Sequence, residues 1–232
     1  VHDRAKLSGV TDVLVVGTDL NSSVRAIEIC RSIDGWRAAV GVHPHECAHF
    51  DTATLEELKV LAEDVQVCAI GEIGLDFYRD NQSAELQEYV FRAQCRLASA
   101  MSLPVVVHQR ESMMLVEQVL ATELGSAGGV MHSFTGDVDA ARRFLNLGLH
   151  VSISGIVTFK NADTVGAMAE VIPNDRLMIE TDSPYLAPVP KRGGRNEPSY
   201  LLHTAEEVAR RRGVSVSSLQ VTTWQNARGL FR

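Results

Sequence analysis

The chain has 232 residues, of which 45% are hydrophobic and 22% are charged, values typical of a globular protein with a sizeable core. It contains no apolar run of roughly eighteen residues and no positively charged apolar leader, which argues against a membrane span and a secretory signal. The formal net charge of −7 argues against a protein that coats nucleic acid without specificity. A nuclease remains compatible with it, because local cations and metal ions can outweigh the overall field.

Short apolar segments alternate with segments of helical periodicity along the whole chain. The predicted strands span residues 12–16, 37–42, 66–70, 105–107, 129–131, 149–153 and 177–179. The predicted helices span residues 22–33, 54–62, 83–101, 113–124, 137–147, 163–171, 199–212 and 215–230, after the end of an earlier helix at residues 4–8. Residues 183–198 are rich in Pro and Gly and are predicted to be a loop.

Strictly alternating β and α units with apolar strands predict a parallel sheet of the α/β class. No linker or low-complexity segment divides the chain, so we expect one domain over residues 1–232, a (β/α)₈ TIM-type barrel. Seven predicted strands preceded by the end of a helix indicate that the first strand is missing. The four cysteines are scattered without a Cys-x-x-Cys pair, which favours reduced thiols and a cytoplasmic location.

Four predicted strands are followed by a potential metal ligand. Glu72 follows residues 66–70 between two glycines, His108 and His132 directly follow two further strands, and Asp182 comes shortly after residues 177–179. A single histidine in such a position is as often a half-buried residue satisfied by neighbouring groups as a ligand. Four such residues at equivalent strand ends favour a metal centre, because the carboxyl ends of barrel strands converge at one face.

Nitrogen and oxygen ligands without thiolate suit Mg²⁺, Mn²⁺ or Zn²⁺. A carboxylate that bridges two such ions would activate a water molecule and hold a leaving oxygen, as in two-metal phosphoester hydrolysis. Glu72 is the natural bridge, because it is the only carboxylate in the first half of this set.

Further polar residues are candidates for contacts to a substrate. His43 lies at a strand end next to Pro44, which makes it a loop residue suited to a substrate contact rather than a ligand, with an exposed turn histidine as the alternative. Lys191 and Arg195 belong to a Gly-rich segment whose cations would suit phosphate oxygens, although such a run is more often a solvated loop. Arg110, two residues beyond His108, has the same two interpretations.

The adjacent aromatic residues Phe77 and Tyr78 also have two interpretations. They could stack on a nucleobase, but aromatic packing under the loop is the more common outcome.

Taken together, seven short motifs resemble those of the TatD family of metal-dependent deoxyribonucleases. They are Gly41-Val42-His43-Pro44-His45, Gly71-Glu72-Ile73-Gly74-Leu75-Asp76, Val107-His108, His132-Ser133-Phe134, Glu180-Thr181-Asp182-Ser183-Pro184, Asn196-Glu197-Pro198 and Asn226-Ala227. The resemblance extends from about Gly9 to Phe231 and implies a TIM-barrel metal hydrolase that cleaves DNA phosphodiester bonds, often as an exonuclease.

The resemblance also implies roles for single residues. Glu72 would bridge two divalent ions, Mg²⁺ or Mn²⁺ with Zn²⁺ as an alternative. His108 and His132 would hold one ion, while Asp182 would help to hold the other and orient the water. His43 and the loop containing Asn196 and Glu197 would line the cleft that binds the DNA backbone. No membrane or obligate protein partner is expected.

One family feature has no counterpart in the chain. Members begin with a strand that ends in His-x-His, so the second ion would have an incomplete ligand set here. Two alternatives therefore stand beside the deoxyribonuclease. One is a hydrolase of C–N or C–O bonds, since the same barrel and ligands activate water for carbonyl attack. The other is a non-catalytic chain with a damaged site.

Overall fold

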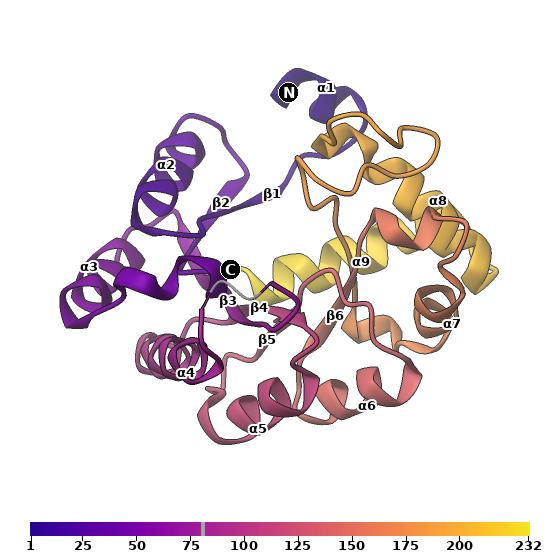
Figure 1. Cartoon of the computed structure of the whole chain (residues 1–232). Coiled ribbons are helices and arrows are strands. Elements are labelled where there is room, and N and C mark those ends of the chain that lie inside the picture. Colours follow the sequence, from indigo (N-terminus) through magenta and orange to yellow (C-terminus); the bar gives the residue numbers. More distant parts are fainter. Residues whose placement is uncertain (80–81) are drawn as a thin grey trace. The chain divides into compact units, whose positions relative to one another are not determined.

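The computed structural model describes residues 1–79 and 82–232, which form two compact units (Figure 1). The first, called the five-strand unit, comprises residues 12–131 and 230–232. The second, called the two-strand unit, comprises residues 1–11 and 132–229. The expectation of one domain over residues 1–232 stays a prediction.

The five-strand unit alternates strands and helices from its first strand to its last. Its elements are β1 (Val13–Val16), α2 (Leu20–Arg31), β2 (Trp36–Val40), the 3₁₀ helix η1 (Pro44–His49), α3 (Thr52–Ala62), β3 (Val67–Asp76), α4 (Ala84–Met101), β4 (Val105–Arg110), α5 (Met113–Glu123) and β5 (Gly129–Met131). Each strand pairs in parallel with the next one along the chain. Figure 1 shows α2, α3 and α4 on one side of these strands.

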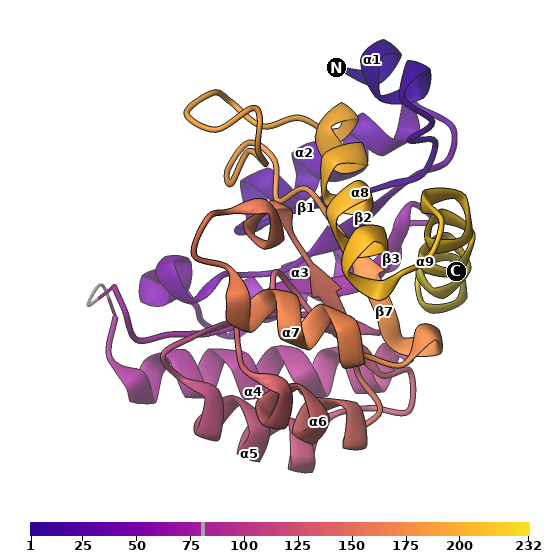
Figure 2. The same cartoon turned by 90° about the vertical axis from the view of Figure 1, so that its right-hand side faces the viewer.

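The two-strand unit also alternates strands and helices. Its elements are α1 (His2–Leu7), α6 (Val138–Asn146), β6 (His150–Ile153), η2 (Gly155–Thr158), α7 (Asp163–Val171), η3 (Asn174–Arg176), β7 (Leu177–Ile179), η4 (Pro198–Tyr200), α8 (Leu201–Arg212) and α9 (Val216–Leu230). Strand β6 pairs in parallel with β7, and Figure 2 shows α7 beside α8, against which it packs.

Parallel strands in chain order, each followed by a helix, confirm the predicted α/β class with the connectivity of a TIM-type barrel. All seven predicted strands are present, and residues 183–197 form the predicted loop. The main difference is that β3 continues to Asp76 and β4 to Arg110, because the two strands keep pairing beyond their apolar runs. Glu72 and His108 therefore lie inside strands rather than after them.

Helix capping and burial explain the main local features. Asp19 and Asp51 accept the backbone N–H of Ser22 and Thr54, so each begins a helix with a capping box. Strand β3 is buried along almost all of its length, as expected of a parallel strand covered on both faces. None of the helices in the described part of the chain is long and apolar enough to cross a membrane.

Two buried glutamines on α4 hold the loops that follow β2 and β3. Gln94 accepts the backbone N–H of Val42 at 2.7 Å and donates to its carbonyl at 3.0 Å. Gln87 makes the same pair of contacts with Asp76, at 2.9 and 3.1 Å. Because both side chains are almost completely buried, these bonds are shielded from water and fix the backbone beside two predicted site residues, His43 and Glu72.

Candidate metal centre

The backbone around Glu72 requires glycine on both sides. A side chain at Gly71 would place its Cβ 2.5 Å from Cβ of Val106, and one at Gly74 would place it 2.0 Å from the His108 carbonyl oxygen. Gly74 also has a φ of +143°, which side chains rarely tolerate. The Glu72 N–H donates to the carbonyl of Gly17 at 3.0 Å. These contacts explain why a carboxylate can be held between strands that are otherwise apolar.

His108 lies between two carboxylates in the five-strand unit. Its Nδ1 is 2.9 Å from Oε1 of Glu72, and its Nε2 is 3.2 Å from Oδ2 of Asp76. The same Asp76 oxygen lies 2.9 Å from Nε2 of His45. An imidazole whose one nitrogen faces a carboxylate is oriented to offer the other nitrogen to a cation, an arrangement common among metal-binding histidines.

Asp76 is only 1% exposed and is nevertheless held as a carboxylate. Burial acts to raise its pKa, but the hydrogen bond with His108 and the backbone N–H of Arg79 outweigh it and set the pKa below the ordinary value. The N–H of Tyr78 also donates to Oδ1 of Asp76, at 3.0 Å. Asp76 therefore supports the imidazoles of His45 and His108 with a fixed negative charge.

His43 is near the same carboxylate, with Nε2 3.7 Å from Oε1 of Glu72. Burial lowers the pKa of His43 to about 3, although the Glu72 carboxylate raises it in part, so the ring is neutral at physiological pH. Its Nδ1 accepts the backbone N–H of His45 at 3.1 Å, which assigns the ring proton to Nε2. In this tautomer His43 is a donor toward Glu72 or a substrate oxygen rather than a ligand.

The two-strand unit holds a second group of potential ligands, His132, Glu180 and Asp182. Nδ1 of His132 is 2.7 Å from Oε1 of Glu180, and its Nε2 is 3.5 Å from Oδ1 of Asp182. Asp182 has a φ of +58°, a left-handed conformation that aspartate tolerates better than most residues. Asn196 fixes the loop by donating to the carbonyls of Thr181 and Tyr185, at 2.6 Å each.

Both groups fit a divalent cation. Potential ligand atoms of Glu72 and His108 lie within 4.8 Å of each other, with a ring nitrogen of the donor His43 equally close, and the same limit holds among His132, Glu180 and Asp182. Oε1 of Glu180 is buried and makes no hydrogen bond among the residues that the structure describes, although Nδ1 of His132 lies 2.7 Å from it. A buried carboxylate oxygen that faces an imidazole nitrogen is suited to share a cation with it, which would remove the desolvation penalty of the carboxylate.

The ligand chemistry agrees with the metals expected from the sequence. Imidazole nitrogens and carboxylate oxygens suit Mg²⁺, Mn²⁺ or Zn²⁺. The four cysteines are buried and free, and burial raises the pKa of Cys47, Cys68 and Cys95 to about 12. Thiolates are therefore not available as competing ligands at neutral pH.

The predicted substrate residues occupy different settings. The guanidinium carbon of Arg110 lies 3.6 Å from the centre of the Tyr78 ring, and Nζ of Lys191 lies 5.4 Å from the centre of the Tyr200 ring. Arg195 is exposed on the loop after β7. The contact of these three cations with phosphates stays a prediction.

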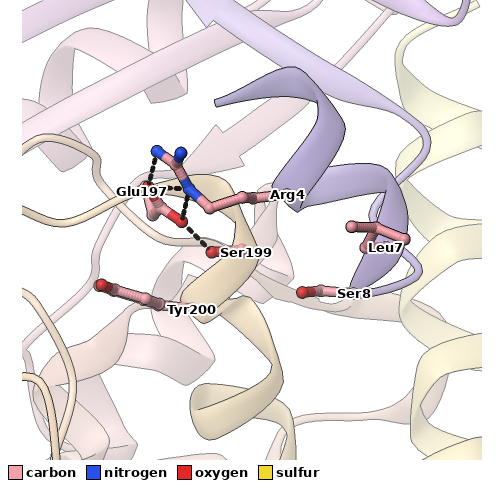
Figure 3. Close-up of a pocket in the computed structure, with 6 residues that line it drawn as sticks. All are labelled: Arg4, Leu7, Ser8, Glu197, Ser199 and Tyr200. Atoms are coloured by element: carbon pink, nitrogen blue, oxygen red, sulfur yellow. Dashed lines mark hydrogen bonds and ion pairs between the residues drawn. The ribbon is translucent and has the colours of Figure 1, made fainter.

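Glu197 and Asn196 have partners within the two-strand unit. Arg4 donates to both carboxylate oxygens of Glu197 at 2.6 to 3.0 Å, Ser199 also contacts it, and these bonds lower the pKa of Glu197 to about 2 (Figure 3). A hollow of about 550 Å³ next to this pair is lined by Arg4, Leu7, Ser8, Glu197, Ser199 and Tyr200 (Figure 3). Asn196 is 2% exposed and bonded to backbone. Both have structural partners, and their substrate-binding role stays a prediction.

The structure thus groups the four predicted ligands by unit. Glu72 and His108 lie together in the five-strand unit, and His132 and Asp182 lie together in the two-strand unit. The sequence analysis did not select Glu180, His45 or Asp76 as site residues. Their signals were present, since Glu180 stands next to a strand end, and the other two are the last residues of motifs already named.

Several known proteins are similar to this chain over its whole length. The family model described as TatD related DNase matches residues 1–232. An uncharacterized metal-dependent hydrolase of Bacillus subtilis (strain 168), YabD, is 40% identical over 233 residues, covering 100% of this chain and 91% of the relative. The 3′-5′ ssDNA/RNA exonuclease TatD of Pantoea vagans (strain C9-1) is 41% identical over 240 residues, covering 100% and 92%.

A solved structure supports the same relationship. The crystal structure of YjjV, a TatD homologue from Escherichia coli K12, superposes with a TM-score of 0.95 at 26% identity. The match covers 99% of this chain and 90% of that chain.

Proposed function

This chain belongs to the TatD-related DNase family of metal-dependent hydrolases, and we propose that it cleaves phosphodiester bonds of DNA as an exonuclease. The observation that carries the proposal is the pair of histidine–carboxylate groups, one in each unit, each at or near the ends of parallel strands. The name of the Pantoea vagans relative, a 3′-5′ ssDNA/RNA exonuclease, supports the choice of nucleic acid as substrate.

We propose that each group holds one divalent ion, Mg²⁺ or Mn²⁺ in preference to Zn²⁺. Glu72 and His108 would bind in the five-strand unit, and His132, Glu180 and Asp182 in the two-strand unit. When bound, such a cation polarises a phosphoryl oxygen and lowers the pKa of a coordinated water. The carboxylates supply most of the negative charge that a hard cation requires.

The remaining steps fall to side chains of the chain itself. Asp182 would orient the attacking water and accept its proton, because its carboxylate stands at the strand end beside His132. His43, as an Nε2–H donor, would contact a phosphate oxygen near Glu72. Arg110, Lys191 and Arg195 would bind further phosphates of the strand and would not read base sequence.

The four free, buried cysteines suit a reducing compartment, and on that ground we place the protein in the cytoplasm. DNA is the proposed partner, and the proposal includes no protein partner.

The test is cleavage of a 5′-labelled single-stranded oligonucleotide with Mg²⁺ or Mn²⁺, with a chelator, and after the metal is restored. We expect cleavage that depends on metal and shortens the strand stepwise from one end. Asp182→Asn should abolish it, whereas Asp139→Asn, which changes an exposed carboxylate on α6, should not. A metal-loaded protein that cleaves no DNA but hydrolyses carboxylic esters or amides would establish the C–N or C–O hydrolase instead.

A further inference from the structure

An exposed aromatic ring lies beside the histidine–carboxylate group of the five-strand unit. The Tyr78 residue is 58% exposed, and the Arg110 guanidinium lies over its ring, with the guanidinium carbon 3.6 Å from the ring centre. Strand register pairs Arg110 with Asp76. Because side chains two residues apart share one face of a strand, Arg110 points to the same side as His108.

The backbone of Tyr78 is held by the same carboxylate that supports the imidazoles. The backbone N–H of Tyr78 donates to Oδ1 of Asp76 at 3.0 Å, while Oδ2 of Asp76 contacts His45 and His108. The N–H of Phe77 donates to the Arg110 carbonyl at 2.9 Å. The backbone next to Tyr78 is therefore bonded to Arg110, and Asp76 links the backbone of Tyr78 to the imidazoles of His45 and His108.

We propose that Tyr78 and Arg110 form a stacking platform for the base of an unpaired nucleotide next to the bond that is cleaved. This inference rests on the proposed function and adds the two residues that would hold the base. An aromatic ring stacks on any base, and the guanidinium extends this flat surface while its charge attracts the adjacent phosphate. A base within a duplex is already stacked and paired, so it reaches the platform only after the strand end opens.

The platform is distinguished from ordinary exposed aromatic residues by these contacts. Tyr89 on α4 is exposed to the same extent, 59%, but its ring packs edge-on against Phe50, with 6.4 Å between ring centres. It provides a matched control, because the same substitution there removes a similar exposed ring from the same unit.

The experiment measures binding by metal-loaded protein of single-stranded oligonucleotides with phosphorothioate terminal linkages, which resist cleavage. One oligonucleotide carries 2-aminopurine at its terminal position, and the other carries an abasic residue there. Tyr78→Ala should weaken binding of the base-bearing strand by roughly 5- to 150-fold, the range for loss of one stacked base, and of the abasic strand by less than about twofold. Tyr78→Phe and Tyr89→Ala should stay within about twofold of the unaltered protein on both strands.

Quenching of 2-aminopurine fluorescence on binding should disappear in Tyr78→Ala and persist in Tyr78→Phe. Equal losses on the two strands, or no loss on either, would overturn the platform. Cleavage of the matching phosphodiester strand by the unaltered protein is followed in parallel. If that strand is cleaved and the base preference is absent, the platform fails alone, whereas a metal-loaded protein that leaves every DNA strand intact refutes the proposed function.

Discussion

The two histidine–carboxylate groups differ in how far hydrogen bonds within the protein already fix their side chains. In the five-strand unit, His108 contacts a carboxylate through each ring nitrogen, and Asp76 is fixed by backbone N–H groups. In the two-strand unit, His132 also faces a carboxylate with each ring nitrogen, but Oε1 of Glu180, which is buried 2.7 Å from Nδ1 of His132, makes no hydrogen bond in the described part of the chain. The first group is preorganised by its neighbours, and the second depends more on a cation to satisfy it.

The two groups should therefore respond to metal in different ways, the first in its affinity and the second in the stability of the folded protein. Preorganised ligands lose little freedom on binding, so their supporting residues influence affinity. A buried charged group without a hydrogen bond is unfavourable until it is neutralised, so a cation there should raise the stability of the folded protein. The predictions below test the two halves of this comparison.

The largest expected effect is the loss of activity in Glu72→Ala. Glu72 is the carboxylate of the five-strand group, 2.9 Å from His108 and 3.7 Å from His43, and its removal takes away negative charge as well as a ligand. We expect kcat/KM on single-stranded DNA to fall by more than about 100-fold, since changes to partners of ligands alone cost about 10- to 100-fold.

His108→Ala should lose less than Glu72→Ala, because water can replace a neutral ligand more readily than a charged one. Glu57→Ala changes an exposed carboxylate on α3 and serves as the control. Full activity in Glu72→Ala would show that the histidine–carboxylate group of the five-strand unit takes no part in catalysis.

The second prediction tests preorganisation through Asp76→Asn. The amide keeps the size of the side chain but removes the charge that faces His45 and His108. Affinity for Mn²⁺, measured by calorimetry, should fall by about 10- to 100-fold at the five-strand group.

The thermal midpoint of the Asp76→Asn protein without metal, and its circular dichroism, separate this effect from misfolding. A variant that folds normally and binds Mn²⁺ as tightly as the unaltered protein would show that Asp76 does not position these imidazoles.

The third prediction concerns the stability gained by the two-strand unit from metal. At metal concentrations about 100 times Kd, binding should stabilise the protein by about 2.7 kcal/mol, a rise in Tm of roughly 5–10 °C for a chain of this size. Glu180→Gln should abolish most of the rise that is due to this group. Its Tm without metal should remain within about 2 °C of the unaltered protein, because the lost carboxylate had no hydrogen bond at Oε1.

Asp139→Asn should show the full metal-dependent rise, since that carboxylate is exposed on α6. An undiminished rise in Glu180→Gln would mean that Glu180 is not a ligand, and the contrast between the two groups would lose its basis.

The sequence was sufficient to predict the strands and helices of the fold and to select four candidate ligands, whose role stays a prediction. Apolar runs bounded by turn residues located every strand, and the polar residues that follow them identified Glu72, His108, His132 and Asp182. These features are local, because the end of a strand can be recognised from a few consecutive residues of the sequence.

The supporting residues could not be found in the same way. Asp76 contacts His108 only because β3 and β4 continue to pair beyond Glu72, and the sequence pattern placed the end of β3 at residue 70. Choosing between Glu180 and Asp182 required the direction of two carboxylates only two residues apart. Gln87 and Gln94 did carry a signal, since two polar residues seven positions apart lie on one helix face, but their backbone partners are distant in sequence.

The smallest expected effect comes from the cationic loop of the two-strand unit, the Gly-rich segment that contains Lys191 and Arg195. It tests whether that unit also positions the DNA strand. Arg195 is exposed and precedes Asn196, whose amide is bonded to the carbonyl of Thr181 next to Asp182. If Arg195 contacts one phosphate, Arg195→Ala should reduce the slope of log K against log salt by about 0.7 for single-stranded DNA. The loss of affinity should be similar for all sequences, because a phosphate contact carries no base information. Arg142→Ala on α6 removes the same charge from the same unit at a residue paired with Asp139, so it should leave the slope almost unchanged. Equal changes of slope in the two variants would show that only net charge matters, while a loss limited to certain sequences would assign base recognition to the loop.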